Sequence, residues 1–137
     1  MRIMAVDLGS VRTGIAICDK LGVLASPYCV LENMGKKKLV LEIFNIAKKE
    51  NVEKIIIGKP ERTDGAFSEM QQKAEGFASF MRKRTEIPIE LYNEAYTTVI
   101  ASQKMHENNV NSKEQKKSID AAAATVLLQD YIDGIKK

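Results

Sequence analysis

The N-terminal part of the chain alternates apolar runs with short polar breaks. Residues 2–8 are almost continuously apolar, the pattern of a strand covered on both faces, and we expect them in the middle of a sheet. Apolar runs over 14–19 and 23–31, separated by a turn that ends at Gly22, predict two further strands in an antiparallel meander. Pro27 cannot donate a ladder hydrogen bond, so the third strand is expected at an edge.

Apolar residues at helical spacing dominate the rest of the chain. The pattern predicts, in chain order, a helix over 36–51, a strand over 54–58, a helix over 67–85, a strand over 87–92, and helices over 98–108 and 118–132. Gly134 is expected to cap the last helix, and the capping-box pair Ser112 and Gln115 offers an earlier start for it. The expected fold class is α/β, with a mixed five-stranded sheet.

Composition and charge fit one domain over residues 1–137. The chain is 45% hydrophobic and 28% charged, which is ordinary for a globular protein. The net charge of +3 is mild, but basic residues cluster at 36–38, 82–84 and 113–117. Each cluster could contact phosphate or could form a solvated helix end. Two cysteines without close spacing indicate neither a disulfide framework nor a zinc site. No signal peptide or membrane span is expected, and we predict a cytoplasmic protein.

The first candidate for chemistry is the segment that follows the first strand. Asp7 closes that strand, and Gly9 and Arg12 are expected inside a glycine turn that ends at Gly14, the start of the next strand. Glycines let a phosphate or another backbone approach closely, and a carboxylate beside them can hold a metal ion. Arg12 is interpreted as a clamp for substrate phosphate in preference to a plain surface residue. Asp7 could equally bond to turn amides.

Two more acids follow apolar elements, as a two-metal phosphoryl-transfer site would require. Glu94 follows the fifth strand, and Asp120 precedes four alanines that would let the last helix approach the sheet. If the fourth strand lies between the first and fifth, Asp7 and Glu94 start from backbones about 10 Å apart, with Gly58 leaving the gap open. Each acid taken singly could instead stabilise a helix N-terminus or a turn.

Motifs over nearly the whole chain resemble the YqgF (RuvX) family. They are, in order, Ala5-Val6-Asp7-Leu8-Gly9 with Arg12 and Gly14, Gly58-x-Pro60 followed by Asp64-Gly65, Glu94-x-x-Thr97-Thr98, and Ile119-Asp120-x-x-Ala123-Ala124. The resemblance implies a ribonuclease H-like fold with helices on both faces of the sheet, related to the Holliday junction resolvase RuvC. It also implies a nuclease that matures the 5′ end of pre-16S ribosomal RNA.

Site residues follow from the same resemblance. The catalytic and metal-binding acids would be Asp7, Glu94 and Asp120, with Mg²⁺ or Mn²⁺ as the cofactor. The residues expected to bind substrate are Gly9, Arg12, Gly14, Gly58, Pro60, Thr97 and Thr98. The partner would be nucleic acid, either precursor rRNA in the pre-ribosome or branched DNA, with no membrane involved. Junction cleavage would favour a homodimer, whereas processing one RNA end would not require it.

The chain departs from the family pattern close to Glu94. The family usually has Asp-Glu-Arg before the Thr-Thr pair, and here the residues are Asn93, Glu94 and Ala95. One acid and one base are therefore missing, and Glu61, in a loop that is usually apolar, could supply a replacement carboxylate. His106 is the only histidine and is expected at the surface, so no histidine base is predicted.

Three other functions use the same features. A Holliday junction resolvase would use the same acids on branched DNA. A sugar-kinase or actin-like ATPase also opens with a strand and Asp-x-Gly, but it needs two such domains, and 137 residues supply one. A non-catalytic RNA-binding or ribosome-assembly module is made credible by Asn93 and Ala95.

Overall fold

A computed structural model describes residues 1–9, 11–60, 69–94 and 113–135, and for 60, 69–70, 93–94 and 113–120 it describes the backbone only. The elements follow in chain order: β1 (Ile3–Leu8), β2 (Arg12–Cys18), β3 (Ala25–Glu32), α1 (Lys36–Lys49), β4 (Lys54–Pro60), α2 (Glu69–Arg82), β5 (Ile89–Glu94) and α4 (Lys113–Ile135). The predicted helix over 98–108 and His106 lie outside the described residues.

The sheet has five strands in the order β3-β2-β1-β4-β5. The pairs β1–β2 and β2–β3 are antiparallel, whereas β1–β4 and β4–β5 are parallel. The predicted meander and the mixed five-stranded sheet are therefore confirmed. The first strand is central as expected, and β4 separates β1 from β5.

Strand β3 forms one edge of the sheet, as Pro27 predicted. Its pairing with β2 shifts between Ile15, opposite Cys29, and Ala16, opposite Pro27. Tyr28 is thus the extra residue of a bulge, and its hydroxyl donates to Glu50 Oε2 over 2.9 Å. An edge strand tolerates a missing donor and a bulge because solvent replaces the lost ladder bond.

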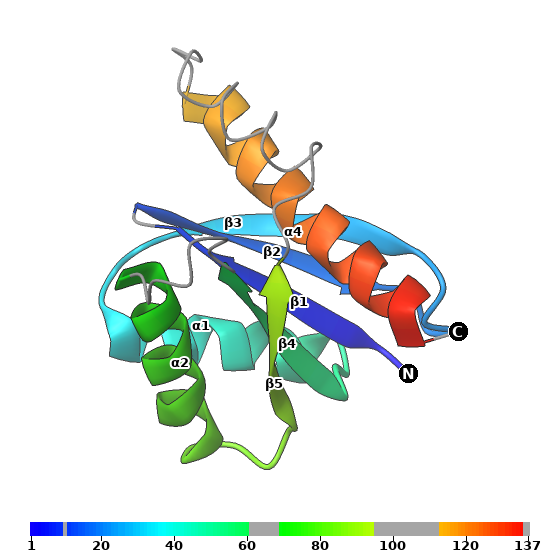
Figure 1. Ribbon diagram of the computed structural model, residues 1–137, viewed down its shortest axis with the longest axis horizontal. Helices are drawn as coiled ribbons and strands as arrows, with labels where there is room; N and C mark the ends of the chain where they lie inside the picture. The colour runs from blue at the N-terminus through cyan, green and yellow to red at the C-terminus, as the bar shows by residue number, and fades with distance from the viewer. Residues whose placement is uncertain (10, 61–68, 95–112, 136–137) are drawn as a thin grey trace.

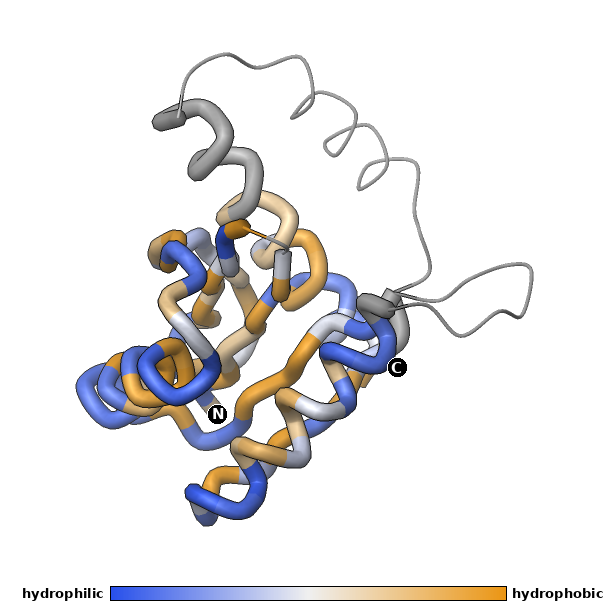
Figure 2. Tube along the Cα trace, turned by 90° about the vertical axis from the view of Figure 1, so that its left-hand side faces the viewer, coloured by the Kyte–Doolittle hydropathy of each residue, from blue (hydrophilic) through white to orange (hydrophobic). Residues whose placement is uncertain are grey.

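Helices cover both faces of the sheet (Figure 1), with α1 and α2 on one face and α4 on the other. Successive side chains of β1 point to opposite faces of the sheet. Met4, Val6 and Leu8 pack with α1 and α2, while Ile3 and Ala5 pack with α4. Figure 2 shows the hydrophobic strands between helices whose outward turns are hydrophilic. The Phe and Met stripe of α2 is core, because Phe77 and Met81 are buried there.

Small residues bring α4 close to the sheet. Ala121, Ala123 and Ala124 are buried, and they are followed on the same helix by Leu127 and Leu128, which are 1% and 0% exposed. Ala5 and Ala16 are the fully buried small residues of the facing sheet surface. The predicted approach of this helix to the strands is therefore confirmed.

Polar contacts at the other end of α4 fix its position. Glu90 Oε2 accepts from Lys54 Nζ at 2.7 Å and from the Tyr131 hydroxyl at 2.6 Å, and Lys54 also bonds to that hydroxyl. The Tyr92 hydroxyl donates to Asp130 over 2.6 Å, which together with burial raises the pKa of Tyr92 to about 12. These contacts tie β4 and β5 to the helix.

Several predicted boundaries are wrong. Strand β4 continues through Lys59 and Pro60, where we expected a loop, and β5 starts and ends two residues later than predicted. The last helix begins at Lys113, the earlier of the two expected starts, and it includes Gly134, which is therefore not a C-cap. A glycine near a helix end costs at most about 1 kcal/mol, so it need not terminate the helix.

Both cysteines are free thiols, with Cys18 buried and Cys29 half-buried. The burial of Cys29 raises the pKa of its thiol. Within the described ranges, no helix is both long enough and apolar enough to cross a membrane.

Candidate active site

Asp7 lies next to the end of β1 on the face of the sheet that α4 covers. Its alternation with Ala5 places it on that face, and it is 7% exposed. Its partner across the antiparallel ladder is Gly14. On the other side, Gly58 follows Ile57, the parallel partner of Val6, so a second glycine lies beside Asp7. The carboxylate therefore has a neighbour without a side chain on each flanking strand.

The turn after Asp7 requires a glycine at its first position. A Cβ on Gly9 would lie 2.3 Å from the Arg12 carbonyl oxygen, far closer than two such atoms can approach. The Gly9 carbonyl accepts from Asn33 Nδ2 at 2.9 Å and from Lys73 Nζ at 3.4 Å. Gly9 thus sets the backbone path that leads away from Asp7.

Asn33, which follows β3, holds this turn and was not predicted. Its backbone N–H donates to the Val11 carbonyl over 3.0 Å, and its Oδ1 accepts from the buried Thr13 hydroxyl over 2.9 Å. With the bond to Gly9, one side chain and its backbone connect both ends of the turn. An isolated asparagine after a strand gives no signal of partners 20 or more positions away in the chain.

Arg12 is the first residue of β2, opposite Glu32 of β3, and it is not part of the turn itself. Alternation with Gly14 and Ala16 places it on the α4 face, the same face as Asp7. The side chain is half-buried. The structure therefore brings Arg12 and Asp7 to one face, although the predicted location of Arg12 inside the turn is wrong.

The backbone positions of Glu94 and Asp120 are described, whereas their side chains are outside the described part. Glu94 is the partner of Pro60, two residues beyond the Gly58–Tyr92 pair. The Glu94 backbone is two strand spacings across the sheet and two residues along the strand from that of Asp7. These offsets place the two backbones roughly 12 Å apart. Asp120 lies three and four residues before Ala123 and Ala124, which are both buried. Thr97, Thr98 and Glu61 fall outside the described residues.

Two of the basic clusters lie at ends of helices α1 and α2. In the cluster at 82–84, Arg82 donates to the Ile89 carbonyl over 3.1 and 2.8 Å, and Arg84 lies 3.5 Å from the centre of the Phe80 ring. Both arginines therefore have structural partners at the end of α2. The lysines at 36–38 form the first turn of α1, where no acidic residue offsets them.

A metal centre cannot be assembled from the described side chains alone. Among them, no three histidine, cysteine, aspartate or glutamate side chains are grouped so that they could hold a metal ion. Asp7 nevertheless has the donor chemistry that Mg²⁺ and Mn²⁺ prefer, namely carboxylate oxygen, and the flanking glycines leave space beside it. Asp7 therefore fits one ligand position of a divalent-cation site.

The strand order and helix placement are those of ribonuclease H-like nucleases. The structure resembles that of Fowlpox virus resolvase in complex with its substrate Holliday junction DNA, with a TM-score of 0.60, 15% identity and complete coverage of both chains. It also resembles Thermus thermophilus RuvC bound to a Holliday junction, with a TM-score of 0.59 and 12% identity over 99% of this chain and 96% of that one. These likenesses define a ribonuclease H-like fold.

The sequence narrows this class to one family. Residues 1–134 match the family RuvX, described as Holliday junction resolvase. A curated relative from Halothermothrix orenii, named "Putative pre-16S rRNA nuclease", is 35% identical over 133 residues, which cover 97% of this chain and 95% of that protein. The chain belongs to the RuvX family, whose members are phosphodiester-hydrolysing nucleases acting on nucleic acid. Nucleases of this fold generally use divalent metal ions.

Proposed function

We propose that this protein is an endonuclease that matures the 5′ end of pre-16S rRNA, with Mg²⁺ or Mn²⁺ held by Asp7, Glu94 and Asp120. The observation that carries the proposal is the position of Asp7, buried on the α4 face between Gly14 and Gly58. The name of the relative from Halothermothrix orenii supports the choice of RNA.

The three acids come from elements that meet on one face. Asp7 is on β1, Glu94 ends a strand two positions away in the sheet, and Asp120 lies about one helical turn before Ala124, which packs on this face. Glutamate has a longer side chain than aspartate, which suits the roughly 12 Å between the backbones of Glu94 and Asp7. Bound there, divalent ions would neutralise charge on the phosphate and make a water more acidic.

Residues of the chain would position the substrate. The Arg12 guanidinium lies on the face of Asp7 and can donate to two oxygens of one phosphate. Gly14 and Gly58 keep bulk away from the carboxylate, so the phosphodiester backbone can approach it. Gly9 would hold the turn beside the substrate. Further contacts with the substrate would come from Pro60, Thr97 and Thr98.

A second function, cleavage of branched DNA, is favoured by the description of the family as Holliday junction resolvases. Symmetric cleavage of a junction needs two active sites, and so a homodimer is the natural assembly. Cutting one end of an RNA needs a single site and is compatible with a monomer. The two functions therefore differ in substrate and in oligomeric state.

A cleavage assay separates these functions. Purified protein should cut an RNA that carries the 5′ precursor segment of 16S rRNA when Mg²⁺ is present, and it should not cut when EDTA is added. A labelled four-way DNA junction of matched length is the parallel substrate, and light scattering gives the oligomeric state. If the protein cleaves only the junction, its function is resolution of branched DNA and not maturation of rRNA. If it binds RNA but cleaves neither substrate, it is a non-catalytic RNA-binding module.

A further inference from the structure

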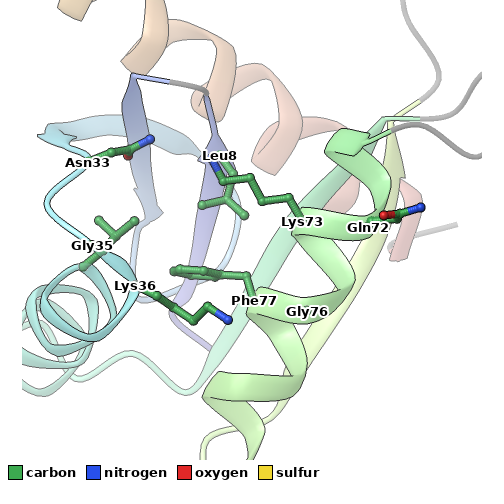
Figure 3. A pocket seen from close by; sticks show the side chains of 9 residues that line it. Leu8, Asn33, Gly35, Lys36, Gln72, Lys73, Gly76 and Phe77 are labelled. Atoms are coloured by element: carbon green, nitrogen blue, oxygen red, sulfur yellow. The ribbon is translucent and has the colours of Figure 1, made fainter.

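A pocket of about 300 Å³ lies on the opposite face of the sheet from Asp7, between the start of α1 and the middle of α2. Its apolar lining consists of Leu8, Leu39 and Phe77, all of which are at least 94% buried. Figure 3 shows the Phe77 ring at its centre, with the Lys73 side chain extending from α2 toward Leu8. The volume is at the lower end of the range for small-molecule sites, about 300–1,000 Å³.

The charges around this pocket are positive. Lys36 and Lys73 line it, and no acidic residue is among the described residues of its wall. Gly35 also lines it as the N-cap of α1, and no side-chain hydrogen bond caps that helix end. The positive end of the helix and both ammonium groups therefore favour an anionic occupant. An apolar floor below cationic groups suits a planar base joined to phosphate.

The pocket is continuous with the turn beside the candidate active site. Leu8, part of its floor, is the residue next to Asp7, and Lys73 Nζ contacts the Gly9 carbonyl over 3.4 Å. Asn33 lines the pocket while it bonds to the same carbonyl. A strand whose phosphate is held near Asp7 can thus place a neighbouring nucleotide at this pocket by passing over the turn.

We infer that the pocket binds one unpaired nucleotide of a single-stranded RNA adjacent to the point of cleavage. The inference rests on the proposed function for the choice of substrate. Base pairing would keep the base stacked in a helix, where the buried Phe77 could not reach it, so the pocket selects single-stranded over fully paired substrate. Lys36 and Lys73 contact phosphates on either side of the bound base.

Gly76 provides a test that fills the pocket without removing any contact. It lies on α2 and lines the pocket, and a Cβ built there meets nothing within 4 Å. Gly76→Leu should weaken binding of a fluorescein-labelled single-stranded hexaribonucleotide on the order of ten-fold, measured by anisotropy in EDTA so that no cleavage occurs. Gly76→Ala is the matched control and should bind as wild type does. Both variants should melt no lower than wild type, because alanine and leucine each favour a helix more than glycine does.

Lysine variants test the phosphate contacts. Lys36→Ala and Lys73→Ala should each lower the slope of log affinity against log salt by about 0.7 for the same RNA. Lys49→Ala, an exposed lysine at the other end of α1, should leave the slope unchanged. Uridine 5′-monophosphate should shift the NMR signals of Leu8, Leu39 and Phe77, and it should not do so in Gly76→Leu.

The outcomes separate this inference from the proposed nuclease function. If Gly76→Leu binds the single strand with wild-type affinity, the pocket does not bind a nucleotide, and this conclusion holds whether or not Asp7 acts in cleavage. An equal loss of affinity for a blunt RNA duplex would also overturn it, because a duplex offers no unpaired base. A loss confined to the single strand would support the pocket even if the protein cleaves nothing.

Discussion

Replacing Asp7 with asparagine is expected to lower the rate of Mg²⁺-dependent RNA cleavage by on the order of 10²–10⁴-fold. Carboxylate-bound ions contribute several kcal/mol to stabilising charge in phosphoryl transfer, and each 1.4 kcal/mol is a factor of ten in rate. Asparagine has nearly the same shape, but its neutral amide is a poor ligand for a hard divalent ion. The measurement is single-turnover cleavage of the precursor RNA at saturating protein.

The fold should survive this change, so the loss of rate can be assigned to chemistry. Asp7→Asn should melt within a few degrees of wild type and bind RNA in EDTA with unchanged affinity. Asp19→Asn is the matched control, because Asp19 accepts bonds from Val23 and Leu24 in the exposed β2–β3 turn and has no place in the candidate site. Wild-type cleavage by Asp7→Asn would remove Asp7 from the mechanism.

Replacing Leu128 with alanine is expected to lower the free energy of unfolding by about 2–5 kcal/mol. Leu128 is 0% exposed and packs in the cluster that joins α4 to the strands. Alanine would leave a cavity between this helix and the sheet, and the melting temperature should fall by on the order of 10 °C. Thermal and urea unfolding followed by circular dichroism provide the measurement.

The control for this change is Leu41→Ala on α1. Leu41 is 59% exposed, so its truncation should change the free energy of unfolding by no more than about 0.5 kcal/mol. Since both substitutions occur in helices and remove the same atoms, the difference measures burial against the sheet. Equal stabilities for the two variants would show that α4 is not docked through Leu128, and the location of Asp120 would lose its support.

The layered sheet could be predicted because its signals are local. The apolar residues of β1, interrupted only by Asp7, require cover on both faces, and Pro27 is compatible only with an edge or a bulge. The alanines before Leu127 likewise indicated a helix that lies close to the strands. Each of these properties belongs to one segment and its own side chains.

Strand ends and turn contacts were less predictable because they depend on partners far away in the chain. Ile87 is apolar like a strand residue, but the pairing of β5 with β4 begins only at Ile89. Arg12 follows Gly9 closely enough to suggest a turn, yet pairing with β3 extends β2 to include it. No local pattern marked Asn33, whose role arises from the turn it contacts across the sheet end.

The candidate site could likewise be predicted only in part. Asp7 and its glycine neighbours could be identified from the sequence, and the ladder then placed Gly14 and Gly58 on either side of it. Which face each residue occupies followed only from the packing of Ala5 and Ala16 against α4. The joint action of Asp7, Glu94 and Asp120 stays a prediction, and so does the effect of Asn93 and Ala95.

A crystal structure of the protein soaked in Mn²⁺, with anomalous diffraction recorded near the manganese edge, tests the central claim most directly. We predict anomalous peaks within bonding distance of the carboxylates of Asp7, Glu94 and Asp120, and their loss from crystals of Asp7→Asn. Carboxylates that point away from one another, with no manganese at Asp7 under conditions in which the protein cleaves RNA, would contradict the proposed site.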